Sequence, residues 1–136
     1  SRPGVMIASD GMPLSSFKQR AHPRGMGTFS RVLAKYVRED KIITLPDAIS
    51  RMSYLPARRL ESFTPAMKRK GRLQIGYDAD ITIFDPKKVI DQATFAKPNQ
   101  FSKGIVHVIV GGELVVKDEM VQEGVFPGKP VSTLSR

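Results

Sequence analysis

One short apolar run near the start of the chain limits what the chain can fold into. The run is Val5–Ala8, and it ends at the polar turn Ser9-Asp10-Gly11. A short apolar run bounded by turn residues is typical of a strand covered on both faces, as in a parallel barrel. Such a strand needs a hydrogen-bonded neighbour on each side, and the next part of the sequence supplies none. We therefore expect the chain to be a piece of a larger fold.

The residues after this run predict a loop and then a helix. Residues 12–27 contain several prolines and glycines and show no period, which favours a loop. Loops of this length in a compact domain are usually functional. A helix is predicted over residues 28–40, because apolar residues recur there at helical spacing. These residues are Phe29, Val32, Leu33, Tyr36 and Val37.

Two shorter helices are predicted next. The segment from Thr44 to Asp47 is a helix-start signature. The Thr44 hydroxyl can accept hydrogen bonds from free backbone N–H groups, and Asp47 suits the positive end of the helix dipole. We expect this helix to run to about Met52. A third helix is predicted over residues 56–60, since proline is tolerated at the first helical position.

After Ser62 the sequence becomes strand-like. Strands are predicted over residues 80–85, 105–110 and 113–117, with residues 120–125 as a last edge strand. Gly111-Gly112 is predicted to be a two-residue hairpin turn, because glycine adopts positive φ without steric cost. We therefore divide the chain into a barrel end at residues 1–62, a linker at 63–72 and a β-domain at 73–136.

The formal net charge of +9 raises the possibility of nucleic-acid binding. The densest basic run, Lys68-Arg69-Lys70 with Arg72, has no interleaved aromatic residues, and the other positive charges are scattered. This pattern favours a solvated linker and a basic surface over a nucleic-acid interface. No apolar run approaches the length of roughly 18 residues that a membrane span requires. We therefore expect neither a nucleic-acid partner nor a membrane partner.

Asp10 is the first candidate for chemistry. A polar residue at the C-terminal end of a barrel strand occupies a catalytic position. An Asp-Gly pair also commonly caps a turn, so position alone leaves both interpretations open. His107 alternates with Ile105 and Ile109 along one predicted strand, which favours a structural, hydrogen-bonded histidine.

Four groups of residues carry a family resemblance. They are Ile7–Gly11 with His22–Phe29 and Arg31–Leu33, Ala48–Ser53 with Leu55–Leu60, Gly71–Leu73 with Gly76, Ala79-Asp80 and Phe84–Pro86, and Gly104–Gly112. Over residues 5 to about 130 the chain resembles the N-acyl-D-amino-acid deacylases, the D-aminoacylase type of metal-dependent amidohydrolase. The Ser-Asp-Gly and His-Pro-Arg-Gly motifs together narrow the resemblance to this group. The third of these groups, which begins at Gly71 and ends at Pro86, is shared with urease-, dihydroorotase- and hydantoinase-like members.

The resemblance implies a fold of class α/β plus β. The chain would hold the last strand and terminal helices of a TIM-like (β/α)8 barrel, followed by part of a small antiparallel β-sandwich, and the fold would be incomplete. The remainder of the barrel, in the same or a separate chain, would then be its first partner. Unpaired strand edges also make a homo-oligomer or a strand-swapped dimer possible.

The resemblance also implies roles for four residues. In the family, the aspartate that closes the last barrel strand faces a zinc-bound water, which makes Asp10 the implied catalytic residue. Asp10 would take the proton of that water and pass it to the departing amine, because an amide anion is too poor a leaving group. Gly11, His22 and Arg24 are the implied substrate-binding residues, and Arg24 could hold a substrate carboxylate by a two-pronged contact.

The metal ligands of the family cannot be placed in this chain. They include a His-x-His pair, further histidines, and a cysteine or modified lysine. The chain has 2 histidines, neither in such a pattern, and no cysteine. We expect zinc in the full-length enzyme and none in this chain alone, where Asp10 is the one possible metal ligand.

The function that the resemblance favours is hydrolysis of a linear amide C–N bond in a small-molecule N-acyl-D-amino acid, with this chain alone inactive. A cyclic-amide hydrolase of the hydantoinase or dihydroorotase type is the alternative within the same class. A non-catalytic binding or assembly module is the alternative from another class. We expect a cytoplasmic location.

The first testable prediction concerns the reading frame upstream of Ser1. If the chain is a fragment of such an amidohydrolase, as the resemblance implies, we expect roughly 300 or more residues upstream, with a His-x-His pair near their start. Sequencing of the gene checks this. A start codon immediately before residue 1 would instead favour the binding or assembly module.

Overall fold

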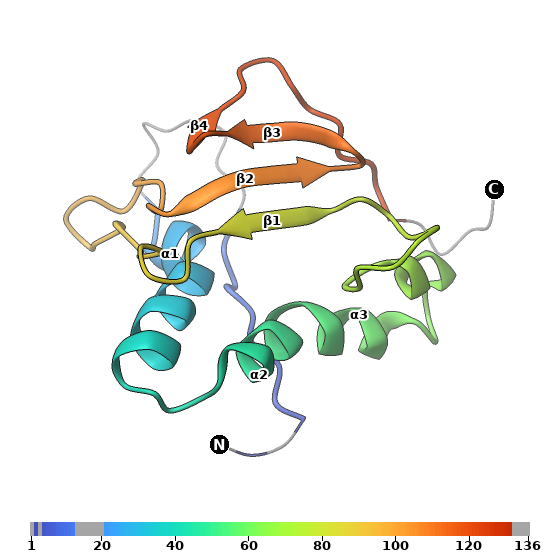
Figure 1. Ribbon diagram of the computed structural model, residues 1–136, viewed down its shortest axis with the longest axis horizontal. Helices are drawn as coiled ribbons and strands as arrows, with labels where there is room; N and C mark the ends of the chain where they lie inside the picture. The colour runs from blue at the N-terminus through green and yellow to red at the C-terminus, as the bar shows by residue number, and fades with distance from the viewer. Residues whose placement is uncertain (1, 3, 13–20, 132–136) are drawn as a thin grey trace. The chain divides into compact units, whose positions relative to one another are not determined.

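The computed structural model describes residues 2, 4–12 and 21–131 (Figure 1). Contacts divide the chain into two compact units. The first unit is Ile7–Ala48 with Phe84–Ile105, and the second is Arg2–Met6 with Ile49–Ile83 and Val106–Arg136. The domain boundaries predicted from the sequence concern the intact protein and stay a prediction. Within the described ranges, no helix is long and apolar enough to cross a membrane.

The first unit begins with a helix that the sequence predicts in part. Helix α1, Arg24–Arg31, continues directly into the π-helix η1, Val32–Glu39. The predicted helix over residues 28–40 is confirmed, but the structure starts it at Arg24. Gly25 and Gly27 in the first turn are poor helix formers, which explains why the pattern hid this start. The start is fixed by the backbone, since the N–H of Gly27 donates to the carbonyl of Pro23 at 3.0 Å.

The next three helical segments form one unbroken run: α2 at Leu45–Ile49, the π-helix η2 at Ser50–Tyr54 and α3 at Leu55–Leu60. The predicted cap is confirmed, because the Thr44 hydroxyl accepts the N–H of Asp47 at 3.3 Å. The predicted break before Pro56 is wrong. Proline inside a regular α-helix clashes with the carbonyl four residues earlier. Here the widened π turn of η2 precedes Pro56 and gives its ring room.

A closed loop over residues 85–104 belongs to the first unit. At its neck, the N–H of Asp85 donates to the carbonyl of Gly104 at 2.9 Å. Gly104 has a φ of +75°, and a Cβ there would lie 2.5 Å from the backbone nitrogen of Val89. Only glycine fits this position without displacing the backbone.

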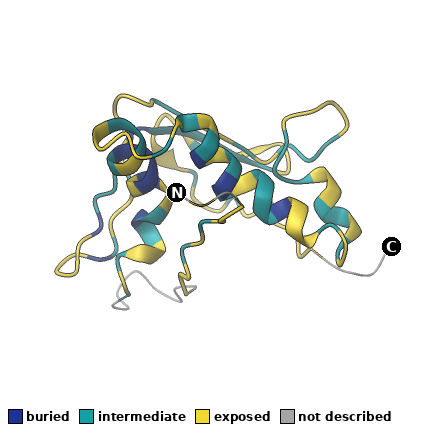
Figure 2. Cartoon of the chain, turned by 90° about the horizontal axis from the view of Figure 1, so that it is seen from below, coloured by how far each residue is buried: buried dark blue, intermediate teal, exposed yellow. Residues whose placement is uncertain are grey.

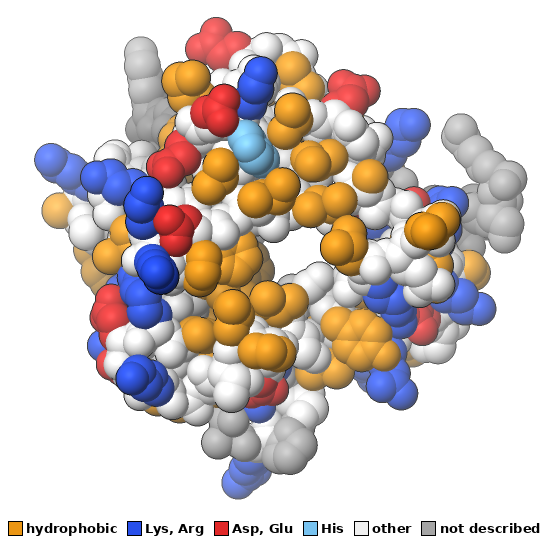
Figure 3. All heavy atoms as spheres, viewed as in Figure 1, with side chains coloured by type: hydrophobic (Ala, Val, Ile, Leu, Met, Phe, Trp, Pro, Cys, Tyr) orange, Lys and Arg blue, Asp and Glu red, His pale blue; other side chains and the backbone are white. Residues whose placement is uncertain are grey.

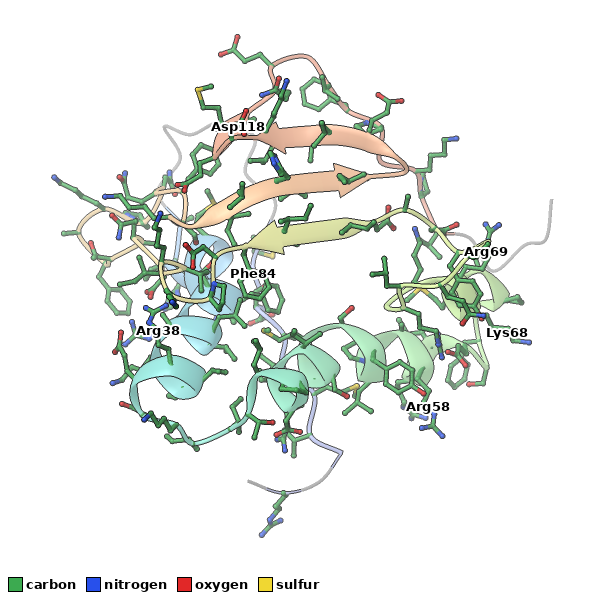
Figure 4. The ribbon with its side chains drawn as sticks, viewed as in Figure 1. Arg38, Arg58, Lys68, Arg69, Phe84 and Asp118 are labelled. Atoms are coloured by element: carbon green, nitrogen blue, oxygen red, sulfur yellow. The ribbon has the colours of Figure 1, made fainter. Side chains whose placement is uncertain are left out.

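Arg38 holds this loop against η1 (Figure 4). Its guanidinium donates to the carbonyl of Pro86 at 3.1 Å and to that of Val89 at 2.7 Å. Val89 is fully buried, and Val32, Leu33 and Ala34 are the buried residues of η1. The loop is therefore anchored by a charged donor beside an apolar core.

The second unit carries a four-stranded sheet in the order β1-β2-β3-β4 (Figure 1). The strands are β1 at Ile81–Phe84, β2 at Ile105–Val110, β3 at Glu113–Lys117 and β4 at Met120–Val121. Both the β2–β3 and the β3–β4 pairs are antiparallel. Gly111 and Gly112 have φ of 58° and 90°, which confirms the predicted hairpin turn. The predicted last edge is shorter than expected, since pairing ends at Val121.

The predicted strand at Val5–Ala8 is wrong for this chain. Among the described residues, those that precede Ile81 form no strand, and the side chains of Val5 and Met6 are 48% and 43% exposed. The physical reason is the absence of partners, because an isolated strand leaves its backbone groups without hydrogen bonds. The barrel and the β-sandwich that the resemblance implies stay predictions; the antiparallel sheet is observed.

The sheet exposes apolar side chains. Most buried positions of the described residues lie on helices (Figure 2), and no residue of β1 to β4 is buried. Hydrophobic side chains gather over the sheet on the face shown in Figure 3. Leu73 and Ile75, which precede β1, are 85% and 99% exposed. A stable domain normally covers such a face.

The basic segment Lys68–Arg72 is folded and paired with carboxylates, while its role as a linker in the intact protein stays a prediction. Residues Pro65–Arg69 form the 3-10 helix η3, which carries Lys68 and Arg69 (Figure 4). Arg69 contacts Asp78 at 3.3 Å. Arg72 forms an ion pair with Glu61. Carboxylates of the same unit therefore neutralise much of this basic run.

Lys70 connects this segment to the sheet. Its ammonium contacts Asp78 at 3.0 Å and also binds Asp80, whose other carboxylate oxygen accepts the N–H of Gly111 at 2.8 Å. The Lys70 ammonium and, next, the Gly111 N–H hold the pKa of Asp80 below its ordinary value. The carboxylate therefore joins the basic segment to the β2–β3 turn.

This pair predicts a pH-dependent stability. A depressed carboxyl pKa stabilises the folded state above the ordinary pKa of 3.8, and the contribution is lost as the pH falls through the folded-state pKa. Asp80→Asn should lower the free energy of unfolding at neutral pH by about 0.5–1 kcal/mol, allowing for solvent screening of a partly exposed pair. Urea titrations should show this difference closing in acid. Glu123→Gln, at an exposed position of the same unit, is the control, and a difference that does not depend on pH would contradict the assignment.

Candidate functional site

The structure brings Asp10 and Arg24 into direct contact within the first unit. An oxygen of the Asp10 carboxylate lies 2.7 Å from Nη2 of Arg24. Nε of Arg24 donates to the backbone carbonyl of Asp10 at 3.0 Å. The Asp10 side chain is 83% exposed and that of Arg24 is 46% exposed, so both groups are open to solvent. Two of the predicted site residues therefore form one ionic contact.

The backbone around Asp10 has an unusual conformation. Asp10 has a φ of +49°, in the left-handed region that aspartate tolerates better than most residues. The N–H of Gly11 donates to the Ser9 hydroxyl at 3.2 Å. A Cβ on Gly11 would lie 2.9 Å from the Cα of Gly25. The chain therefore passes Asp10 tightly across the first turn of α1.

His22 orders the start of α1. Its Nδ1 accepts the backbone N–H of Arg24 at 3.1 Å. Its ring meets the ring of Phe95 edge to face, with the centroids 5.0 Å apart. His22 is therefore fixed on one side by the helix and on the other by the closed loop.

A cavity of about 440 Å³ lies at this end of α1. His22, Arg24, Thr28 and Arg31 line one part of it, and Asp91 and Phe95 from the closed loop line another. Arg31 and Asp91 form an ion pair at 3.2 Å. The hydrogen bond to Asp91 raises the pKa of the Arg31 guanidinium. The cavity thus has charged side chains and one aromatic wall.

The described residues contain no cluster of three metal-ligating side chains. Within residues 2, 4–12 and 21–131, no three His, Cys, Asp or Glu side chains are placed to hold one. The carboxylate of Asp10 faces a guanidinium. His107 is hydrogen-bonded as predicted, because its Nδ1 accepts the N–H of Asp118 at 3.2 Å.

Sequence reasoning missed the contribution of the closed loop. Asp91 and Phe95 reach α1 from far along the chain, and neither stands in a recognisable motif. A Cβ on Gly27 would lie 3.0 Å from the Cβ of Asp91, so the loop and the helix approach closely. Gly27 was the only local signal, since a glycine inside a helix often marks a close packing contact.

Comparisons with known proteins give the context of this site. Residues 4–116 match the model of the Amidohydrolase family. The chain is 42% identical over 107 residues to an N-acyl-D-glutamate deacylase from Alcaligenes xylosoxydans xylosoxydans, covering 79% of this chain and 20% of that protein. It is 32% identical over 108 residues to a dihydroorotase from Lactobacillus acidophilus, covering 74% and 24%.

Solved structures of similar proteins resemble this one. A crystal structure of D-aminoacylase superposes with a TM-score of 0.75 at 38% identity, covering 87% of this chain and 23% of that chain. An N-acyl-D-glutamate deacylase from Bordetella bronchiseptica, complexed with zinc and a phosphonate mimic of the tetrahedral intermediate, superposes with a TM-score of 0.69 at 40% identity, covering 94% and 23%. The chain thus spans about a fifth to a quarter of the length of the relatives and structures that it matches.

The close approach of Gly11 and Gly25 predicts opposite effects for two similar substitutions. Gly11→Ala places a Cβ against backbone, so it should destabilise the protein by about 1–3 kcal/mol. Gly25→Ala meets only an ordinary contact of 3.9 Å and gains helix propensity, so it should be neutral or stabilise by up to about 1 kcal/mol. Urea unfolding of both variants measures the difference. Equal effects would contradict the observed packing.

Proposed function

Because the chain belongs to the amidohydrolase family, we propose that the complete protein is a metal-dependent hydrolase of the linear amide bond in N-acyl-D-amino acids. The observation that carries this proposal is the 42% identity to an N-acyl-D-glutamate deacylase, against 32% to a dihydroorotase over a similar length. The likeness to the D-aminoacylase structure supports the same substrate class.

Asp10 is the proposed proton carrier of this reaction. Hydrolysis adds water to the amide carbonyl carbon and breaks the C–N bond, and the amine can leave only when its nitrogen is protonated. A carboxylate that takes a proton from the attacking water and donates it to that nitrogen ends the cycle unchanged. The exposure of Asp10 supports this role, because its oxygens are open to a substrate and are oriented by Arg24.

Arg24 is the proposed contact for the substrate carboxylate. A guanidinium has five N–H donors in a planar fork, and the two contacts with Asp10 engage Nη2 and Nε. The remaining donors suit a second carboxylate. Arg24 would then bridge the α-carboxylate of the substrate and Asp10. Such a bridge would place the amide nitrogen near the proton that it needs.

Gly11 and His22 complete the proposed substrate side. Gly11 lies next to Asp10 and permits the close crossing over α1. His22 binds the backbone N–H of Arg24 and lines the cavity at that end of the helix. In this proposal both residues act by fixing the positions of Asp10 and Arg24.

The catalytic metal is assigned to polypeptide outside this chain. The described residues form no group of metal ligands, whereas the relative from Bordetella bronchiseptica was solved with zinc. We therefore propose that the remainder of the barrel, in the same or a separate chain, supplies the zinc site. This chain by itself should be inactive.

The exposed sheet supports the same picture of an incomplete fold. None of its residues is buried, and apolar side chains cover the face shown in Figure 3. We propose that the sheet is part of a β-sandwich that further strands of the complete protein cover. A strand-swapped dimer would cover the same surface by exchange between copies.

A cyclic-amide hydrolase is the second candidate, and the dihydroorotase match is the observation that favours it. The two candidates differ in substrate. Turnover of N-acyl-D-amino acids without turnover of hydantoins or dihydropyrimidines by the zinc-loaded complete protein would support the first. The reverse pattern would support the second.

The proposed role of Asp10 predicts a severe loss of activity when its carboxylate is replaced by a neutral amide. Asp10→Asn in the complete protein should lower kcat by about 10²–10⁴-fold, the usual contribution of a general acid–base group. Steady-state assays on an N-acyl-D-amino acid measure this effect. Asp40→Asn, at an aspartate paired with Lys35 in the same unit, is the matched control and should keep most of the activity. Unchanged turnover in Asp10→Asn would refute the assignment.

A further inference from the structure

The closed loop contacts α1 and the residues just before it at several places, all within the first unit. The Phe95 ring packs edge to face against His22, with an interplanar angle of 84°. Asp91 forms an ion pair with Arg31, the last residue of α1. Between them, Gly27 leaves so little room that a Cβ there would come within 3.0 Å of Asp91 and 3.6 Å of Ala93. The loop therefore follows the helix closely from its first turn to its last.

One of these contacts is linked to Asp10 and Arg24 through a short series of contacts. Phe95 contacts the His22 ring, and Nδ1 of that ring accepts the N–H of Arg24. The same Arg24 holds both the carboxylate and the backbone carbonyl of Asp10. The position of His22 thus bears on the first residue of α1, and through it on Asp10.

The exposure of Phe95 is informative. Its side chain is 71% exposed, so it contributes little to the core. A large apolar ring in water is unfavourable, and among the described residues the Phe95 ring packs edge to face against that of His22.

We propose that Phe95 is a positioning residue, which acts through His22 to fix Arg24 and thereby the contact between Arg24 and Asp10. The inference rests on the proposed function, since it assigns Phe95 to the same site. The contact that joins Phe95 to this site is the one with the His22 ring. Its role is to limit the motion of the His22 ring, and so of the first turn of α1.

The test uses Phe95→Ala in the complete, metal-loaded protein. An edge-to-face aromatic contact corresponds to about a two- to ten-fold effect, so kcat/KM for an N-acyl-D-amino acid should fall by that factor. The loss should appear mainly in KM, because Arg24 is the proposed carboxylate contact. The pH profile should keep its shape, because Asp10 is intact. Phe95→Tyr retains the ring and should restore kcat/KM.

Phe101→Ala is the matched control. Phe101 lies in the same closed loop and is also an exposed phenylalanine, at 56%. It does not line the cavity at α1. This variant should leave both kcat and KM as in the unsubstituted protein. An equal loss in Phe101→Ala would show that the loop matters only for folding and would overturn the proposal.

Amide hydrogen exchange gives a readout that does not depend on activity. In Phe95→Ala, exchange over residues 24–28 should rise, whereas Phe101→Ala should leave it unchanged. Unchanged exchange in Phe95→Ala overturns the proposal, as does faster exchange with unaltered kinetics. A complete protein that hydrolyses no N-acyl-D-amino acid would refute the proposed function, and the exchange result would still decide whether Phe95 holds the helix start.

Discussion

The contact between Asp10 and Arg24 is the interaction on which the rest of the candidate site depends. It joins a segment without regular structure to the first residue of α1. From Arg24 the helix continues into η1, where Arg38 binds two carbonyl groups of the closed loop. That loop returns Phe95 to His22, and His22 binds the N–H of Arg24. These contacts join α1, η1, the closed loop and His22 in a ring, so each contact helps to hold the others in place.

The two units differ in how they are stabilised. Buried apolar residues of the first unit lie in η1, in α2 and in the closed loop, whereas the sheet of the second has none among the residues described. In the second unit, ionic contacts around Lys70 and Arg72 are a larger part of the interactions that hold the fold together. Partly exposed ion pairs stabilise a fold only modestly. The sheet is therefore the region that gains most from the strands we assign to the rest of the protein.

Local chemistry made parts of the structure predictable. The hairpin at Gly111-Gly112 and the Thr44 cap follow from the conformations and hydrogen bonds of the residues themselves, and both are observed. The sequence also singled out Asp10 and Arg24 as separate candidates, and the structure joins them. Their catalytic roles stay a proposal.

Features that depend on distant parts of the chain were not predictable. The run at Val5–Ala8 has the composition of a strand, but a strand exists only with partners. Pro56 was expected to begin a helix, because nothing in the local pattern announces the π turn before it. Phe95 reaches His22 only because Gly104 and Arg38 close and hold the loop.

The order in which the segments of the two units follow one another along the chain also affects biosynthesis. The helices α1 and η1 leave the ribosome well before residues 84–105, which belong to the same unit, and residues 49–83 leave before β2 to β4. Until then Arg38 lacks the carbonyls that it binds, and Asp80 lacks the N–H of Gly111. Because their segments alternate along the chain, the two units are completed together, in contrast to the usual domain-by-domain order.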